Sequence, residues 1–250
     1  MDHISSISHP PTINAVNLIL LFQDDFVDAE RVRLTGRRLE HVARVHRVTV
    51  GEELIVGVAN GRIGRGTVMR LDDAALELQV VLETEPPPPL PVTLILALPR
   101  PKVLNRVIAG ATSLGVKRIV LINSWRVEKS YWKSPRMTPE NLRLQSILGL
   151  EQARDTMLPV IEQRRLFRPF IEDELPAIAE GTRALVAHPV AHEECPHSVA
   201  GAVTLAIGPE GGFIAPEVAS LARAGFTAVS MGPRILRVET AVAAILARLF

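Results

Sequence analysis

The chain has 250 residues, enough for one large domain or two modest ones. Hydrophobic residues make up 47% of it and charged residues 22%, which excludes a disordered or fibrous protein. The formal net charge of +1 does not indicate a nucleic-acid binder, so any basic surface must be local.

Residues 1–16 are polar, contain Pro10-Pro11 and are expected to form a loose N-terminal extension. The apolar run at 15–22 is too short to span a bilayer. It also lacks the basic region and the cleavage site of a signal peptide. The single cysteine, Cys195, excludes an internal disulfide and suits a reducing compartment. These features predict a soluble cytoplasmic protein with no membrane partner.

The next part, residues 17–85, alternates short apolar runs with turn signals, which is typical of β-strands. Strands are expected in NLILLF, EELIVGV, GTVMRL and ALELQVVLE. Asn60-Gly61 suits a tight hairpin turn between two of these strands. A small, mostly β, barrel-like domain is therefore predicted.

One helix is expected in this part of the chain, over residues 36–45. Its sequence, GRRLEHVARV, places Leu39, Val42 and Ala43 on one face. That face is predicted to pack on the strands.

ETEPPPPLP, at residues 83–91, is the clearest domain boundary. Four consecutive prolines cannot continue a helix or a sheet and instead form a stiff extended spacer. We therefore expect a proline linker at 86–91, followed by a second domain at 92–250.

From residue 92 onward, apolar β runs alternate with amphipathic helices. This alternation predicts an α/β domain whose parallel sheet is covered on both faces. The strand VTLILAL precedes a helix that begins at Pro101 and ends at Gly115, a natural helix stop. The elements expected after it are a strand at 116–122, a helix at 139–153, strands near 182–188 and 203–208, a helix at 216–225, a strand at 227–232 and a helix at 237–250.

Three loops follow expected strands: AHP at 187–189, IGPEGG at 207–212 and MGPRIL at 231–236. Ligands bind beyond the carboxyl ends of strands in open parallel sheets. Glycines let a ligand approach the backbone, and prolines lower the ordering cost of binding. The helices after the last two loops offer unpaired N–H groups. A cofactor cradle is therefore predicted, with ordinary strand-to-helix turns as the alternative.

GPEGGF at 208–213, together with MGPRILRVETA at 231–241, resembles the SPOUT class of S-adenosylmethionine-dependent methyltransferases. Within that class the chain resembles the RsmE-type enzymes, which methylate N3 of a uridine in 16S ribosomal RNA. The segments at 113–132 and 148–155 and the small β domain also fit this family. The resemblance implies an rRNA (uracil-N3)-methyltransferase of the small ribosomal subunit, active in rRNA processing and ribosome biogenesis.

The resemblance also implies a SPOUT-type domain with a trefoil knot at 92–250 and a PUA-like RNA-binding β-barrel at 17–85. The enzyme would be a homodimer whose sites the partner chain completes. S-adenosyl-L-methionine would bind in a bent shape, mostly through main-chain groups of the loops. The expected cofactor-binding residues are His188, Pro189, Ile207, Gly208, Pro209, Glu210, Gly211, Gly212, Met231, Gly232, Ile235, Leu236, Arg237 and Thr240.

Uracil N3 carries a proton, and its removal at neutral pH costs a few kcal/mol. A cation near the uracil oxygens lowers that cost because it stabilises the anion. Arg237 and Arg234 are the main catalytic candidates, and Arg154 is a third. Arg154 stands in Glu-Gln-Ala-Arg-Asp where the family often has Glu-Gln-Cys-Gly-Arg. The alternative for each arginine is an ion pair with a neighbouring carboxylate.

A general base is harder to assign. Glu210, Glu239 and Asp155 are the candidates, but carboxylates at helix starts are usually caps. Water, or electrostatic stabilisation alone, is the alternative.

Both tryptophans and the only tyrosine lie within residues 122–136, among basic side chains. Aromatic faces stack on unpaired bases, and cations hold phosphates. The alternative is that the tryptophans pack against the partner chain or another loop. A second candidate RNA surface is the arginine-rich run at 31–47, with a solvated helix face as the alternative. The expected RNA-binding residues are Arg31, Arg33, Arg37, Arg38, Arg44, Arg47, Trp125, Arg126, Lys129, Tyr131, Trp132, Lys133 and Arg136.

No metal site is expected. His188, His192, Glu193, Cys195 and His197 do not have zinc-protease spacing, and Pro196 interrupts the helix such a site needs. Three alternative functions stay open: a SPOUT-class tRNA ribose methyltransferase, a non-catalytic RNA-binding ribosome assembly factor, and an anion-binding α/β hydrolase. The hydrolase lacks a recognisable nucleophile elbow.

Overall fold

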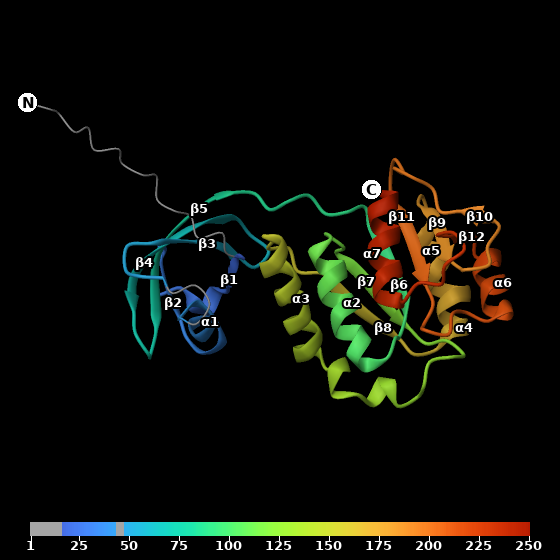
Figure 1. Cartoon of the computed structure of the whole chain (residues 1–250), viewed down its shortest axis with the longest axis horizontal. Coiled ribbons are helices and arrows are strands. Elements are labelled where there is room, and N and C mark those ends of the chain that lie inside the picture. The colour runs from blue at the N-terminus through green and yellow to red at the C-terminus, as the bar shows by residue number, and fades with distance from the viewer. Residues whose placement is uncertain (1–16, 44–47) are drawn as a thin grey trace, which may run out of the picture. The chain divides into compact units, whose positions relative to one another are not determined.

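The computed structural model describes residues 17–43 and 48–250. The chain forms two compact units, whose elements are labelled in Figure 1. The first unit comprises the chain up to Pro86 and the segment Glu151–Met157, and the second comprises Pro87–Leu150 and Leu158–Phe250. Two of the predicted RNA-binding residues, Arg44 and Arg47, lie outside the described residues, as does the extension at 1–16.

A five-stranded sheet forms the first unit, in the order β1-β3-β4-β5-β2. Only β1 and β3 run parallel, and the other neighbours are antiparallel. Asn60 adopts a left-handed backbone (φ 59°) between β3 and β4, which confirms the predicted hairpin. The elements of this unit are β1 (Ile19–Leu21), η1 (Gln23–Asp25), β2 (Arg31–Leu34), α1 (Gly36–His41), β3 (Glu53–Val58), β4 (Ile63–Leu71) and β5 (Leu76–Thr84).

The strand β2 was not predicted, because its sequence RVRL reads as part of a basic run. Its arginines are exposed and Val32 and Leu34 are buried, as expected for one face of a sheet on a core. In and after α1, Leu39 and Val42 are buried as predicted, but Ala43 is exposed. The backbone has π-helical winding at Val42 and Ala43.

The segment Glu151–Met157 completes the first unit although it lies far along the chain. The Leu18 amide donates to the Glu151 carbonyl at 2.9 Å, and the Asn60 amide donates to the Thr156 carbonyl at 2.8 Å. The carboxylate of Glu151 also forms an ion pair with Arg37 at 3.2 Å. No local pattern in the sequence indicated this return of the chain.

A seven-stranded sheet forms the second unit, in the order β10-β12-β9-β11-β6-β7-β8, and every neighbouring pair is parallel. The predicted α/β domain with a parallel sheet is therefore confirmed. The strands are β6 (Val92–Ala97), β7 (Arg118–Ile122), β8 (Val160–Arg164), β9 (Arg183–Ala187), β10 (Glu193–Glu194), β11 (Val203–Ile207) and β12 (Thr227–Ser230).

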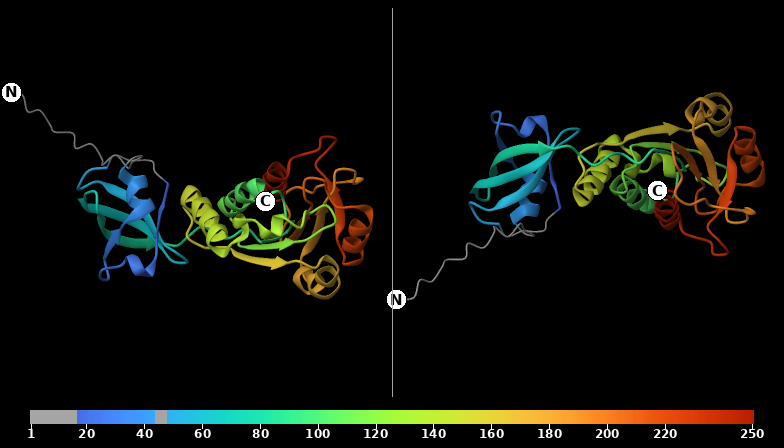
Figure 2. Two further views of the ribbon diagram at one scale, coloured as in Figure 1. Left: turned by 90° about the horizontal axis from the view of Figure 1, so that it is seen from below. Right: turned by 90° about the horizontal axis from the view of Figure 1, so that it is seen from above.

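Helices cover both faces of this sheet, with α2 and α7 side by side on one of them (Figure 2). The opposite face carries a helical segment at 167–179, which was not predicted because Pro169 and Pro176 interrupt its pattern. The helical elements are α2 (Pro101–Ser113), η3 (Tyr131–Lys133), η4 (Pro135–Met137), α3 (Pro139–Ala153), α4 (Phe167–Pro169), η5 (Phe170–Glu174), α5 (Leu175–Ala179), α6 (Ala215–Arg223) and α7 (Val238–Leu249).

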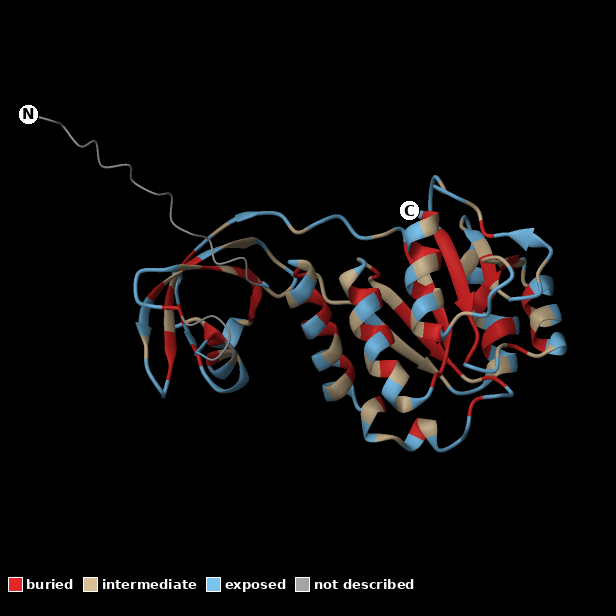
Figure 3. Cartoon of the chain, in the orientation of Figure 1, coloured by how far each residue is buried: buried red, intermediate tan, exposed pale blue. Residues whose placement is uncertain are grey.

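The core of the second unit follows the central strands, which are buried along their length (Figure 3). All five residues of β11 are buried, because apolar side chains enter both layers of helices. Gly115 ends the first long helix with φ 90°, as its position predicted. Within residues 17–43 and 48–250, none of the helices combines the length and apolar character that crossing a membrane requires.

Candidate functional site

The three predicted loops start from three neighbouring strands of the parallel sheet. β9 lies between β12 and β11, and its last residue, Ala187, pairs with both Ile207 and Val229. The carboxyl ends of these strands therefore meet at one edge of the sheet. The loops that follow, 187–189, 207–212 and 231–236, are brought together there.

A cavity of about 210 Å³ opens between these loops and the inner face of α7, and we call it the cradle. All the predicted cofactor-binding residues line it except Arg237 and Thr240, which are exposed at the start of α7. Arg234, a catalytic candidate, lines it as well. The lining residues outside the predicted loops and residues are Val229, Ser230, Val238, Ala241 and Ile245.

Three of these unpredicted residues, Val238, Ala241 and Ile245, lie on α7. Their spacing of three and four residues places them on one helix face. That spacing was visible in the sequence, but the buried face of a helix does not reveal whether it meets a core or a ligand.

The cradle is built largely from main chain. A Cβ atom on Gly208 would lie 2.9 Å from the Phe213 nitrogen, so only glycine permits this close fold of the loop. Gly212 (φ 72°) and Gly232 (φ 98°) adopt left-handed conformations that other residues rarely take. A cofactor with both polar and apolar parts can bind such a site, because main-chain groups form hydrogen bonds with its polar parts and apolar side chains contact the rest.

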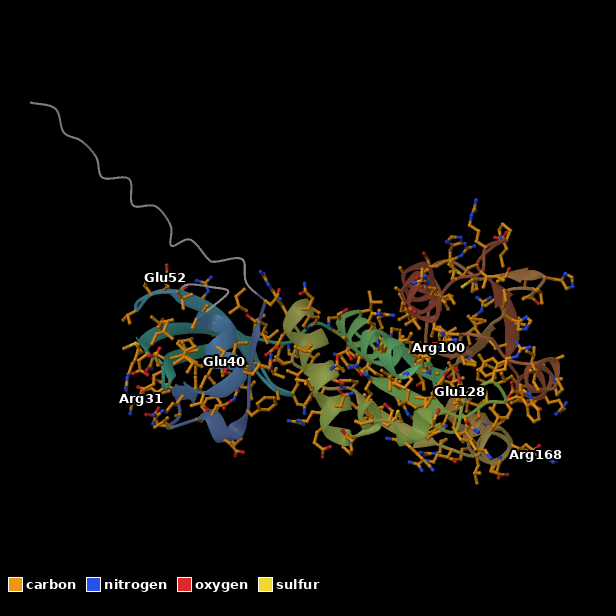
Figure 4. All side chains as sticks on the ribbon, turned by 60° about the horizontal axis from the view of Figure 1, so that its bottom comes forward. Arg31, Glu40, Glu52, Arg100, Glu128 and Arg168 are labelled. Atoms are coloured by element: carbon orange, nitrogen blue, oxygen red, sulfur yellow. The ribbon has the colours of Figure 1, made fainter. Side chains whose placement is uncertain are left out.

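Two contacts tie the central loop of the cradle to the rest of the unit. The Glu210 carboxylate accepts the Arg100 amide at 2.9 Å, at the N-terminus of α2 (Arg100 is labelled in Figure 4). The Arg126 guanidinium donates to the Gly211 carbonyl. A Cβ on Gly211 would lie 2.7 Å from Arg126 Cδ, so the outer surface of this loop is covered by Arg126.

The other predicted acid and base residues also have structural contacts. Glu239 on α7 forms an ion pair with Arg106 on α2 at 3.0 Å. Asp155 is buried and accepts the Met157 amide at 2.9 Å. Both Asp155 and Arg154 belong to the first unit. None of these three residues lines the cradle, and neither does Arg237, which occupies the N-cap position of α7 directly after the loop at 231–236.

Trp132 is only 9% exposed and packs in the core of the second unit, so its predicted stacking on RNA is wrong. Its indole N–H donates to Asn123 Oδ1 at 3.0 Å, and the Arg165 guanidinium lies 5.6 Å from its ring centre. The ring is thereby fixed on both its edge and its face.

We expect Trp132→Ala to lower the free energy of unfolding by about 3 kcal/mol, because it empties a large core site. Chemical denaturation measures this, with Trp125→Ala as the control, since Trp125 is 80% exposed. An unchanged unfolding midpoint together with weaker RNA binding would restore the stacking role.

The remaining residues of the aromatic segment are mostly at the surface. Trp125, Arg126, Lys129 and Lys133 are exposed. The Tyr131 hydroxyl donates to Glu128 at 2.8 Å (Glu128 is labelled in Figure 4). Burial, followed by this hydrogen bond, raises the pKa of the Tyr131 phenol, so it stays protonated at neutral pH. Arg136 is half-buried.

Most of the described arginines that were predicted to bind RNA in the first unit form ion pairs within that unit. Arg38 binds both carboxylate oxygens of Asp25, which is 9% exposed, and also the Leu20 carbonyl. Arg37 pairs with Glu151, and Arg31 with Asp28. Arg33 is exposed and forms no ion pair with the described residues. Arg38 is therefore structural, and Arg33 is the one of these four arginines that forms no ion pair with the described residues.

The histidine-rich segment near 188–197 contains no metal-type cluster among the described residues. Cys195 is buried, and burial raises the pKa of its thiol. The thiol therefore stays neutral and packs as an apolar group.

Residues 86–250 match the model of the RNA methyltransferase domain family. The chain is also similar to two proteins named Ribosomal RNA small subunit methyltransferase E. The Mycobacterium bovis protein is 29% identical over 234 residues, covering 90% of this chain and 88% of its own. The Treponema pallidum protein is 29% identical over 235 residues, which cover 92% of this chain and 88% of that protein.

A crystal structure of the Neisseria gonorrhoeae Ribosomal RNA small subunit methyltransferase E, bound to S-adenosyl methionine, has the same fold. It superposes with a TM-score of 0.73 and 22% sequence identity, and covers 93% of this chain and 95% of its own.

Proposed function

The chain belongs to the RNA methyltransferase domain family, and from this premise we propose that it transfers a methyl group from S-adenosyl-L-methionine to N3 of a uridine in 16S ribosomal RNA. The observation that carries the proposal is the cradle, in which three loops from adjacent parallel strands present main-chain groups at one edge of the sheet. The named relatives, which are rRNA small subunit methyltransferases, support the choice of RNA.

The residues of the cradle suit S-adenosyl-L-methionine. The cavity of about 210 Å³ has His188, Pro189, Gly211 and Gly212 in common with the lining of a further one of about 630 Å³. Ile207, Leu236 and Ile245 offer apolar contacts, and the loop amides and carbonyls offer hydrogen bonds. When bound, the cofactor supplies an electrophilic methyl group.

The protein's own part in the reaction is to position the uridine and to stabilise its N3 anion. Arg237 is proposed to act on the target base, because it follows the cradle loop directly and is exposed. Arg234, in the cradle wall, is the second cation. Arg154 and Glu239 were further candidates, and the ion pair of Glu239 with Arg106 favours a role in holding α7 against α2.

The finer features of the fold are also proposals. We propose that the second unit contains a trefoil knot and that residues 17–85 form a PUA-like domain that contacts RNA, with Arg33 available at its surface. A proline linker at 86–91 would join it to the methyltransferase domain at 92–250. The active form would be a homodimer, and we propose a cytoplasmic location, which an rRNA substrate supports.

The test is nucleoside analysis of 16S rRNA from a strain that lacks this chain. We expect 3-methyluridine to be lost at one position and restored by the wild-type protein. If instead 3-methyluridine persists and a tRNA ribose methyl group disappears, the tRNA enzyme is the correct alternative. If no modification changes and calorimetry detects no S-adenosylmethionine binding, the chain is a non-catalytic RNA-binding factor.

A further inference from the structure

A third cavity, of about 730 Å³, lies in the second unit and is separate from the cradle and from the cavity of about 630 Å³. Its walls come from the loop after β7, from the helical segment at 167–172 and from α6. We call it the tryptophan cavity, and its apolar lining consists mainly of Trp125, Phe167, Ile171, Ile214, Pro216 and Ala219. Trp125 contributes a side chain that is 80% exposed. A large aromatic left in water beside an apolar cavity indicates a binding surface.

The charged residues that line the tryptophan cavity are three cations, Lys129, Arg168 and Arg223, and two carboxylates, Glu172 and Glu217. Glu172 is already paired with Arg168 at 2.8 Å (Arg168 is labelled in Figure 4). Lys129 and Arg223 form no ion pair with the rest of the described chain.

Glu217 is buried, and its carboxylate accepts two backbone amides, from Trp125 at 2.7 Å and from Ile214 at 3.0 Å. Its charge is therefore satisfied by the main chain at the start of α6. The first of these contacts also holds the backbone of Trp125 against the start of α6.

A polar group in the wall also lacks a partner. Ser124 is 3% exposed, and its hydroxyl has no hydrogen-bond partner among the described residues. A buried hydroxyl without a partner costs free energy.

The cavity of about 630 Å³ has lining residues in common with both other cavities: Gly211 and Gly212 with the cradle, and Ile214 and Ala219 with the tryptophan cavity. The cradle and the tryptophan cavity therefore border the same short segment of the second unit, residues 211–219.

We propose that the tryptophan cavity binds an unstacked nucleobase of the RNA substrate, next to the base that is methylated. The base stacks on the Trp125 indole, and the adjoining phosphate lies near Lys129 and Arg223. This chemistry fits single-stranded RNA, in which splayed bases stack on aromatic side chains and phosphates pair with cations. The inference rests on the proposed function for its substrate, RNA.

The test compares full-length variants in their affinity for a fluorescently labelled single-stranded oligoribonucleotide that contains uridine. Anisotropy is expected to show binding weakened on the order of tenfold by Trp125→Ala, because one base–aromatic stack is lost. Trp125→Phe, which keeps an aromatic face, should retain most of the affinity. Val160→Ala is the matched control, since Val160 is an exposed apolar residue that lines none of the three cavities.

Two further measurements distinguish the alternatives. The Kd for S-adenosylmethionine and the sedimenting mass should not change in Trp125→Ala. Wild-type RNA affinity in this variant would overturn the proposal, and a simultaneous fall in sedimenting mass would assign the surface to a second copy of the chain. The RNA affinity requires no turnover, so it tests the cavity even if 3-methyluridine formation is not found.

Discussion

Ala241→Phe is expected to raise the Kd for S-adenosylmethionine at least about a hundredfold, which corresponds to about 2.7 kcal/mol. Ala241 lies on α7 and lines the cradle, whose volume is about 210 Å³. A benzyl group there would occupy the space that the ligand needs. The main-chain groups of the loops would be unchanged, so the loss would be steric.

Calorimetric titration measures this effect, and thermal denaturation reports whether the fold survives. Ala243→Phe is the matched control, because Ala243 is on the same helix but exposed, and it does not line the cradle. Ala241→Leu adds a smaller group and should give an intermediate loss. Wild-type affinity in a folded Ala241→Phe protein would show that the cofactor binds elsewhere.

Arg237→Ala is expected to lower kcat about a hundredfold and to change the Kd for S-adenosylmethionine by less than about threefold. Arg237 is exposed and does not line the cradle, so cofactor contacts should persist without it. The lost interaction is a guanidinium that stabilises the N3 anion as the proton leaves. Arg237→Lys should recover part of the rate, because it keeps the charge but not the planar fork.

Single-turnover methylation of 16S rRNA and calorimetric titration separate the two quantities. Arg183→Ala is the control, since Arg183 is an exposed arginine at the amino end of β9, whereas the cradle lies at the carboxyl ends. An equal loss of rate and of cofactor affinity would reassign Arg237 to binding the cofactor.

Much of the cradle was predictable because it depends on local sequence. Each of its loops follows a short apolar run, and glycine and proline specify the turn within a few residues. The long helices also depend on local sequence, and the helix Pro139–Ala153 has the bounds that were predicted for it. The sites of Gly212 and Gly232, both with positive φ, follow from the same residue chemistry.

Other features depend on residues far apart in the chain. Arg126 reaches Gly211 across 85 positions, and it covers the outer side of the cradle loop. Trp125 and Trp132 look alike in the sequence, yet one is exposed and the other is in the core. Which of two neighbouring aromatics is buried depends on the volume left by other elements, and no local pattern contains that information.

The sequence by itself therefore determined that this chain has a β unit and a parallel α/β unit, and that loops rich in glycine and proline follow the strands of the latter. Only the tertiary structure decided that β12, β9 and β11 are neighbours, that Glu151–Met157 returns to the first unit, and that a cavity forms beside Trp125. The physical reason is the distance along the chain over which each effect acts. Helix and turn preferences act over a few residues, whereas strand order and burial minimise the free energy of the whole packed unit.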